Sequence, residues 1–298
     1  MALRTSTTER QRRLGAELRK LREEAGYSVT EGGEFIGMAR AHLGHVEAGR
    51  TAIPPEKLRT LCRAYRCTRE PLIEALVAMG EDSGKGWWTE YRHAVAPAAL
   101  DLAELEAAAD ALLSYESLFI PGILQIADYT RSIFRSSQSE RSEYDLDKAV
   151  RFRMERQRIL AQEQPPTLHA VIHEAALHVR FGGAAVMRRQ LLHLIRMAEL
   201  PHVTIQVLPF TAEGLSAFST PFLFAVSHKS ALETVLVENP AASHYVHERD
   251  AVLRYRTRFD RLRAASLPPV DPGVPASSHE SRDSLALIQH LLYSLQED

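Results

Sequence analysis

The sequence has few cysteines and no long apolar run. Cys62 and Cys67 are the only two thiols among 298 residues. Two thiols at this spacing do not make a disulfide framework, so we expect a reduced, cytoplasmic protein with two packed cysteines. No stretch approaches the roughly 18 consecutive apolar residues of a membrane helix, which excludes a membrane partner of that kind. The segment Met1–Thr8 has no apolar signal core, and we expect no secretion.

Metal-ligand patterns are also missing. His173 and His178 lie about 140° apart on a helix of about 3.6 residues per turn, whereas a zinc-protease motif places both histidines on one face. His244 and His247 can share a helix face with Glu248, but no further ligand is evident. The histidines therefore predict ordinary polar positions and no metal site.

Catalytic loops are equally hard to find. Gly214–Phe218 lacks the second glycine of a nucleophile elbow, and no ordered Asp and His can be assigned to its serine. No glycine-rich loop that would cradle a phosphate is present. We expect neither an enzyme nor a cofactor.

Charge and length indicate two domains with different partners. The chain has ordinary globular contents of 45% hydrophobic and 25% charged residues, and a net charge of −2. Residues 1–70 contain 14 Lys/Arg against 9 Asp/Glu, so the remainder carries 22 against 29. A basic head on an acidic body is what a nucleic-acid-binding head requires.

The beginning of the chain predicts two helices. Between Glu9 and Ala25, apolar residues recur at helical spacing, and Gly26 follows as a stop. Ser28, with Glu31 three positions later, is typical of a capping box that opens the second helix.

Three more helices follow in the sequence. Gly37 permits a sharp turn before a third helix over about 39–47, which Gly49 ends. Pro54–Pro55 opens a fourth helix, and a fifth follows Pro71. These elements predict an all-α N-terminal domain.

Residues 37–50 resemble the third helix of the phage-repressor, or XRE, family of helix-turn-helix domains. The resemblance implies an operator in double-stranded DNA and a recognition helix in its major groove. Arg40, Ala41 and His45 then occupy base-facing positions: Arg40 can fork onto guanine, His45 can donate to an acceptor, and Ala41 can touch a thymine methyl. His42 and Arg50 lie where phosphate contacts are expected. The match rests on Gly37, Met38, Leu43, Val46, Glu47 and Gly49.

Four residues depart from that family. Ala39 replaces the usual Ser or Thr cap, which costs about 1 kcal/mol. Gly32 and Gly33 interrupt the second helix at about 0.5–1 kcal/mol each. Val29 stands where a phosphate-contacting Gln is frequent. We therefore expect a loose second helix and weak DNA binding.

The larger part predicts an α+β domain with a small sheet. After a polar linker at residues 81–86, Trp87 and Trp88 open the domain, and aromatics in that place usually anchor a domain to its own core. Arginines at 151, 153, 156 and 158 favour a solvated helix face that pairs with acidic neighbours over a second nucleic-acid surface. Helices are expected over residues 100–114, around 129–134, and over 145–160, 184–200, 243–265 and 282–295. Strands are expected over 168–172, 203–208, 221–226 and 234–237, and a turn at 228–230 joins the last two. A loop is expected over 268–281.

This part also resembles the C-terminal domain of a group of actinobacterial XRE-type regulators, which is described as antitoxin-like. The resemblance implies a sensor or partner-docking domain. It implies control by a small partner protein encoded nearby or by a small-molecule ligand that it does not name. The matching segments are 86–88, 115–116, 121–125, 153–157, 173–177, 187–191 and 207–210.

The sequence thus predicts residues 1–80 as a helix-turn-helix domain, 81–86 as linker and 87–298 as an α+β domain. The leading hypothesis is a cytoplasmic, homodimeric transcriptional regulator whose recognition helices enter successive major grooves roughly 34 Å apart. The alternative is an antitoxin-like protein that sequesters a partner through a helical bundle with weak or lost DNA binding. An enzyme with a DNA-binding head is a third hypothesis, which requires bound metal or cofactor.

Overall fold

The computed structural model describes residues 6–137, 142–213, 220–227, 232–238, 242–273 and 283–295. The chain divides into two compact units. Unit 1 comprises residues 1–90, 96–105 and 227–232, and unit 2 comprises residues 91–95, 106–226 and 233–298. None of the described helices is both long and apolar enough to cross a membrane.

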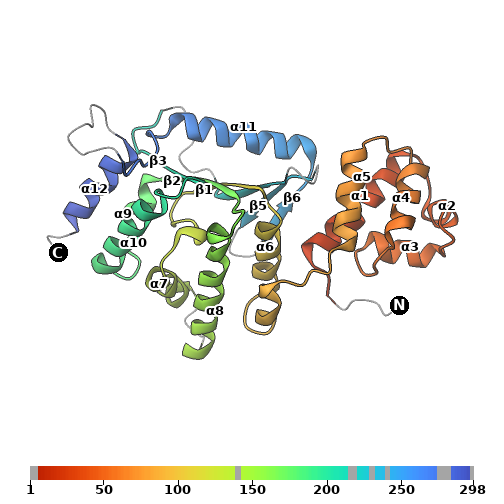
Figure 1. The fold of residues 1–298 in the computed structure, drawn as a ribbon, viewed down its shortest axis with the longest axis horizontal. Coiled ribbons are helices and arrows are strands. Elements are labelled where there is room, and N and C mark those ends of the chain that lie inside the picture. The colour runs from red at the N-terminus through yellow and green to blue at the C-terminus, as the bar shows by residue number, and fades with distance from the viewer. Residues whose placement is uncertain are drawn as a thin grey trace. The chain divides into compact units, whose positions relative to one another are not determined.

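Unit 1 is built on a bundle of short helices (Figure 1). Its core is aliphatic, with Leu18, Leu43 and Leu61 fully buried. The helices begin and end close to the predicted boundaries because local signals set them: Gly26 and Gly49 have positive φ angles of 79° and 73°, which favour glycine. The elements are α1 (Glu9–Glu24), α2 (Val29–Glu34), α3 (Arg40–Glu47), α4 (Pro55–Ala64), α5 (Glu70–Glu81) and η1 (Trp87–Tyr91), of which the last residue belongs to unit 2.

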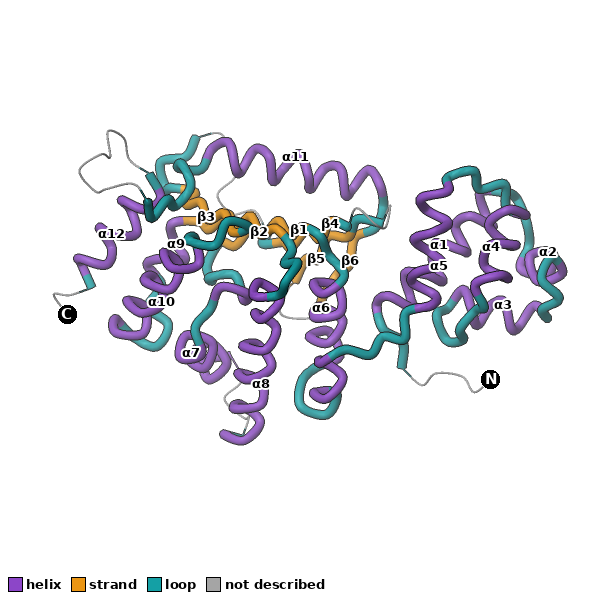
Figure 2. The backbone as a smooth tube through the Cα atoms, viewed as in Figure 1, coloured by secondary structure: helices purple, strands orange, loops and turns teal. Residues whose placement is uncertain are grey.

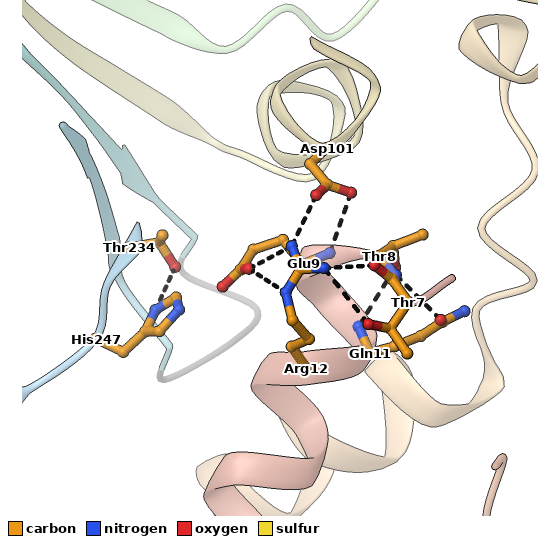
Figure 3. Close-up of polar contacts among 8 residues, drawn as sticks. All are labelled: Thr7, Thr8, Glu9, Gln11, Arg12, Asp101, Thr234 and His247. Atoms are coloured by element: carbon orange, nitrogen blue, oxygen red, sulfur yellow. Dashed lines mark hydrogen bonds and ion pairs between the residues drawn. The ribbon is translucent and has the colours of Figure 1, made fainter. Parts of the chain in front are cut away.

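The start of α1 is fixed by a capping box and by helix α6 (Pro97–Ala107). The Thr8 amide donates to Gln11 Oε1 at 3.2 Å, and the Gln11 amide donates to Thr8 Oγ1 at 3.4 Å. Asp101 of α6 accepts from the Glu9 amide at 3.1 Å and from Arg12 Nη2 at 2.9 Å (Figure 3). The first turns of α6 therefore belong to unit 1.

Unit 2 contains a six-stranded mixed sheet (Figure 2). The strand order is β3-β2-β1-β4-β5-β6, in which β3, β2 and β1 run parallel and the remaining neighbours pair antiparallel. The strands are β1 (Ala111–Glu116), β2 (Thr167–His173), β3 (Val203–Leu208), β4 (Phe222–Val226), β5 (Thr234–Glu238) and β6 (Ser243–Val246).

Helices cover both faces of this sheet (Figure 1). The crossovers between the parallel strands carry α7 (Ala127–Ser137), α8 (Glu143–Arg156), α9 (Glu174–His178) and α10 (Ala184–Met197) along one face. On the other face α11 (Arg249–Ala265) packs Phe259 and Leu262 against buried side chains of the strands. The remaining elements are η2 (Gly122–Leu124), η3 (Gln157–Ala161) and α12 (Ser284–Ser294).

The predicted fold class, a helical helix-turn-helix region followed by an α+β part, is confirmed. Two segments were predicted wrongly as helix. Residues 111–114 lie in β1, where Leu112 pairs with Leu168 of β2, and residues 243–246 form β6 beside β5. In both cases pairing with another strand overrides the local helical pattern: β1 pairs with β2, far along the chain, whereas β6 pairs with β5, the strand just before it. The predicted turn at 228–230 lies outside the described residues.

Candidate DNA-binding surface

Helix α3 divides its side chains between the core and solvent. Leu43 and Val46 are 0% and 2% exposed and face the interior of unit 1. Arg40, Ala41 and His42 are exposed. This is the pattern of a helix that packs on one side and presents its first turn to a partner.

The other two predicted site residues lie at the end of the same segment. His45 is half-buried, and Arg50 is exposed just after Gly49. Among the described residues, the side chains of Arg40, His42, His45 and Arg50 make no hydrogen bond or ion pair. The structure therefore brings all five predicted positions together on one short stretch with free donors.

The N-terminus of α3 is uncapped, as the sequence predicts. Ala39 has extended φ and ψ angles of −63° and 148° and offers no side-chain acceptor to the first turn. The first amides of a helix carry partial positive charge and seek an acceptor. An anionic oxygen, such as that of a DNA phosphate, would satisfy them and gain from the helix dipole.

A buried ion pair holds α3 from behind. Arg22 Nε donates to Glu47 Oε1 at 2.7 Å and Nη2 donates to Oε2 at 3.0 Å, while Nη1 donates to the Tyr27 carbonyl at 2.7 Å. The two charged side chains are 7% and 6% exposed. The hydrogen bonding of Arg22 to the Glu47 carboxylate is the main cause that raises the pKa of Arg22. A bidentate pair of this kind fixes both position and orientation of the helix end.

Glycines allow the close approaches around α3. A Cβ on Gly32 would lie 2.5 Å from Tyr65 Oη and 2.9 Å from a Leu43 methyl, and one on Gly33 would collide with the Met38 carbonyl oxygen. Both glycines are buried, and the predicted Ser28–Glu31 capping box is present. Gly32 and Gly33 therefore serve close packing of α2 against the rest of unit 1, a reason that the sequence alone did not give.

A groove runs beside the exposed turn of α3. It measures about 590 Å³ and lies between the end of α1, the start of α2 and the middle of α3. Gly44 faces open space, with no atom within 4 Å of the position of a Cβ. Sequence reasoning missed Gly44, Thr30 and Arg19 as parts of this surface; a glycine in the middle of a helix was the available signal. The groove is lined by Arg19, Arg22, Glu23, Ser28, Val29, Thr30, Arg40, Gly44, Glu47 and Ala48.

His173 and His178, considered as metal ligands, make other polar contacts. His173 ends β2, where its Nδ1 accepts from the Ala175 amide at 3.1 Å, and His178 Nε2 lies 3.6 Å from Glu174 Oε1. Within the described ranges, no three His, Cys, Asp or Glu side chains are arranged to hold a metal ion. Gly214–Phe218 lies outside the described residues.

The expected helix face with His244 and His247 does not exist. His244 belongs to β6, and His247 follows it, with Nδ1 3.5 Å from Thr234 Oγ1 (Figure 3). The pairing of β6 with β5 replaces the helix that would have aligned the two rings.

Unit 2 has a buried charge cluster on the α8 side of the sheet. Arg156 Nε lies 2.9 Å from Glu106 Oε2, with both side chains below 10% exposed. Arg153 Nη1 donates to Gln125 Oε1 at 2.8 Å. Burial, reinforced by the charge of Glu238, raises the pKa of Glu116 to about 8, and burial is also the main cause that lowers the pKa of Arg153 to about 10.

Comparison with known families divides the chain at similar places. A helix-turn-helix domain matches residues 13–76, and a domain of unknown function (DUF5753) matches residues 99–271. No curated protein and no solved structure matches the chain. The helix-turn-helix match runs from within α1 into α5 and supports a DNA-binding regulator.

Proposed function

The chain belongs to the DUF5753 family and carries a helix-turn-helix domain, and from this premise we propose that it is a transcriptional regulator that binds operator DNA. The observation that carries the proposal is that the first turn of α3 is exposed to solvent, while the buried Arg22–Glu47 ion pair fixes the other end of the helix. A rigid helix with unpaired donors suits entry into the major groove.

Each residue of the surface receives a role from its position. Arg40 forks onto guanine, His45 donates to a base or phosphate oxygen, and Ala41 contacts a thymine methyl. His42 and Arg50 contact phosphates of the DNA backbone. These are the roles of an XRE-type domain.

Unit 2 supplies control rather than chemistry. It has a core of its own, and we assign it dimerisation and the response to a ligand or a small partner protein. Two recognition helices of a dimer would then reach successive grooves roughly 34 Å apart. The chain would work on DNA in the cytoplasm, without catalytic activity.

A single substitution tests the recognition surface. The probe is a duplex that carries the region upstream of the chain's own gene, titrated against the full-length protein at several salt concentrations. Arg40→Ala should weaken binding by about 1–3 kcal/mol, roughly 5- to 150-fold, if Arg40 reads a guanine. Arg63→Ala removes the same charge from an exposed position on α4 and should leave binding unchanged. Equal, salt-insensitive binding of wild type and Arg40→Ala would overturn the proposal.

A partner-sequestering protein is the second candidate, and Val29 favours it. This half-buried valine stands at the start of α2 in the groove wall and offers no hydrogen bond to a phosphate. If sequestration is the function, tagged protein should recover one partner in equal amount while occupying no DNA sites in the cell. Enriched DNA sites that disappear with Arg40→Ala would exclude it.

A further inference from the structure

Helix α11 is rich in arginine, in contrast to the acidic part of the chain around it. Its 17 residues contain six Arg and two Asp, whereas residues 71–298 as a whole carry more Asp and Glu than Lys and Arg. Val252, Phe259 and Leu262 bury one side of the helix against the sheet. The function of each arginine therefore depends on whether its side chain lies toward the sheet or toward solvent.

Two of these arginines serve the fold. Arg256 forms an ion pair with Glu233 and lies over the Phe224 ring, 4.8 Å from its centroid. Arg263 Nη2 lies 3.5 Å from Asp260 Oδ1 within the helix. Neither is available to an outside partner without loss of a contact.

Three others form one outward stripe. Arg254, Arg258 and Arg261 follow the i, i+4, i+7 spacing that puts side chains on one helix face, and they span about 10 Å along the axis. Arg254 and Arg261 are exposed and Arg258 is half-buried. None of the three has a hydrogen bond or ion pair with another described residue. We call these three residues the α11 stripe.

The three arginines of the stripe repel one another, and an anionic partner would lower this repulsion. Arg254 and Arg258 are like charges at i, i+4, which destabilise a helix by about 0.2–0.5 kcal/mol per pair, and Asp250, four residues before Arg254, offsets only part of this repulsion. Other arginines of unit 2 pair with carboxylates, as exposed Arg189 does with Asp128 at 2.7 Å and half-buried Arg131 with Asp147 at 2.6 Å.

The chemistry of the stripe favours a phosphate backbone over a protein. Protein interfaces centre on buried aromatic or aliphatic anchors, and the stripe contains none. Leu253, an exposed apolar side chain of α11, lies about 100° around the helix from Arg254. Guanidinium groups match phosphates through paired hydrogen bonds.

We propose that the α11 stripe is a second DNA contact that binds backbone phosphates without reading sequence. The inference rests on the proposed function, since the helix-turn-helix domain brings the duplex to the chain. Two contacts on one chain strengthen binding through local concentration, even when each alone is weak. Arg40 would then select the site, and the stripe would add affinity on any sequence.

The test compares two triple variants of the full-length protein on a 40-base-pair duplex of mixed sequence. Arg254→Gln/Arg258→Gln/Arg261→Gln should weaken binding at low salt by roughly tenfold or more and reduce the slope of log K against log salt by about 2–3. The matched control, Arg151→Gln/Arg188→Gln/Arg196→Gln, removes the same charge from α8 and α10, on the other face of the sheet, and should leave both values near wild type. Replacing the stripe by lysines should restore most of the slope.

The outcomes separate the stripe from the recognition helix. If the stripe variant loses affinity equally on the upstream duplex and on the mixed duplex, the inference holds even where Arg40→Ala has no effect. If the stripe variant binds as wild type does, the stripe is no DNA contact and the inference is overturned. Equal losses in both triple variants would show that net charge alone matters, and would overturn the inference as well.

Discussion

The two units bury charge in opposite ways. In unit 1, Arg22 and Glu47 form one balanced pair. Two nitrogen atoms of the Arg22 guanidinium donate to the Glu47 carboxylate, and the third donates to the Tyr27 carbonyl. In unit 2, Arg153 and Arg156 lie near carboxyl groups that outnumber them: Glu106, Glu116 and Glu238, which is exposed at the end of β5 and raises the pKa of the other two.

The difference teaches what each arrangement is suited to. A balanced bidentate pair fixes geometry, and it stands directly behind the helix that we assign to DNA recognition. An unbalanced cluster leaves at least one carboxyl group that holds its proton near neutral pH, which makes the surrounding fold sensitive to pH. The Arg22–Glu47 pair fixes the position of α3, and the cluster in unit 2 makes the stability of that unit depend on pH.

The largest effect should come from breaking the balanced pair. Glu47→Ala leaves a guanidinium buried without its partner, so unit 1 should lose about 3–5 kcal/mol of unfolding free energy, and DNA affinity should fall with it. The chain's two tryptophans, Trp87 and Trp88, both lie in unit 1, so urea unfolding followed by tryptophan fluorescence reports this unit.

Glu74→Ala is the matched control for that experiment. Glu74 pairs with Arg59 at the surface, where its side chain is 52% exposed, and such pairs contribute about 0–1 kcal/mol. Arg22→Met combined with Glu47→Leu should cost less than Glu47→Ala, because no charge is left buried. If Glu47→Ala lowers the unfolding free energy no more than Glu74→Ala does, the buried Arg22–Glu47 pair contributes no more than the surface Arg59–Glu74 pair, and the distinction between them fails.

A pH profile tests the unbalanced cluster. The pKa of Glu116 is about 8 in the folded chain against an ordinary value of 4.5, so the folded state retains a proton that the unfolded chain releases. This contribution to stability is complete below pH 4.5 and is lost as pH rises through 8. Unfolding midpoints of wild type, measured by circular dichroism between those limits, should therefore fall with pH more steeply than those of Glu116→Gln.

Glu238→Gln provides a graded control. The charge of Glu238 is the second cause of the raised pKa of Glu116, after burial, and its removal should make the pH dependence shallower without abolishing it. His169, His173 and His193, whose pKa values burial lowers, are unchanged in all three proteins. Parallel profiles for wild type and Glu116→Gln would show that the cluster does not respond to pH.

The sequence predicted unit 1 better than unit 2 for a physical reason. Ser28, Gly49 and Pro55 mark helix ends through contacts within a few residues, and α3 was placed almost to the residue. Strand β1 depends on Leu112 meeting Leu168 in a neighbouring strand, which local patterns do not record.

The same distinction separates the predicted site residues from the missed ones. Arg40 and Arg50 follow from the motif around α3, whereas the role of Gly32 depends on Tyr65, a residue of another helix. The three arginines of the α11 stripe already lie in the predicted helix over 243–265, but the side of that helix that faces the sheet becomes known only from the packing of Phe259 and Leu262 on the strands.

The smallest expected effect compares two glycines of unit 1: Gly33, on the tightly packed side, and Gly44, on the open side that faces the groove. Gly44→Ala adds a methyl group where no atom lies within 4 Å, so the higher helix propensity of alanine should stabilise unit 1 by about 0.5–1 kcal/mol. Gly33→Ala, the same change in the neighbouring helix, forces a methyl onto the Met38 carbonyl oxygen and should destabilise it by about 1–3 kcal/mol. Fluorescence-detected urea midpoints that move in the same direction would contradict this assignment of tight and open sides. Opposite shifts would show that Gly33 is fixed by packing, while Gly44 is free of it and leaves room in the groove where DNA is proposed to approach.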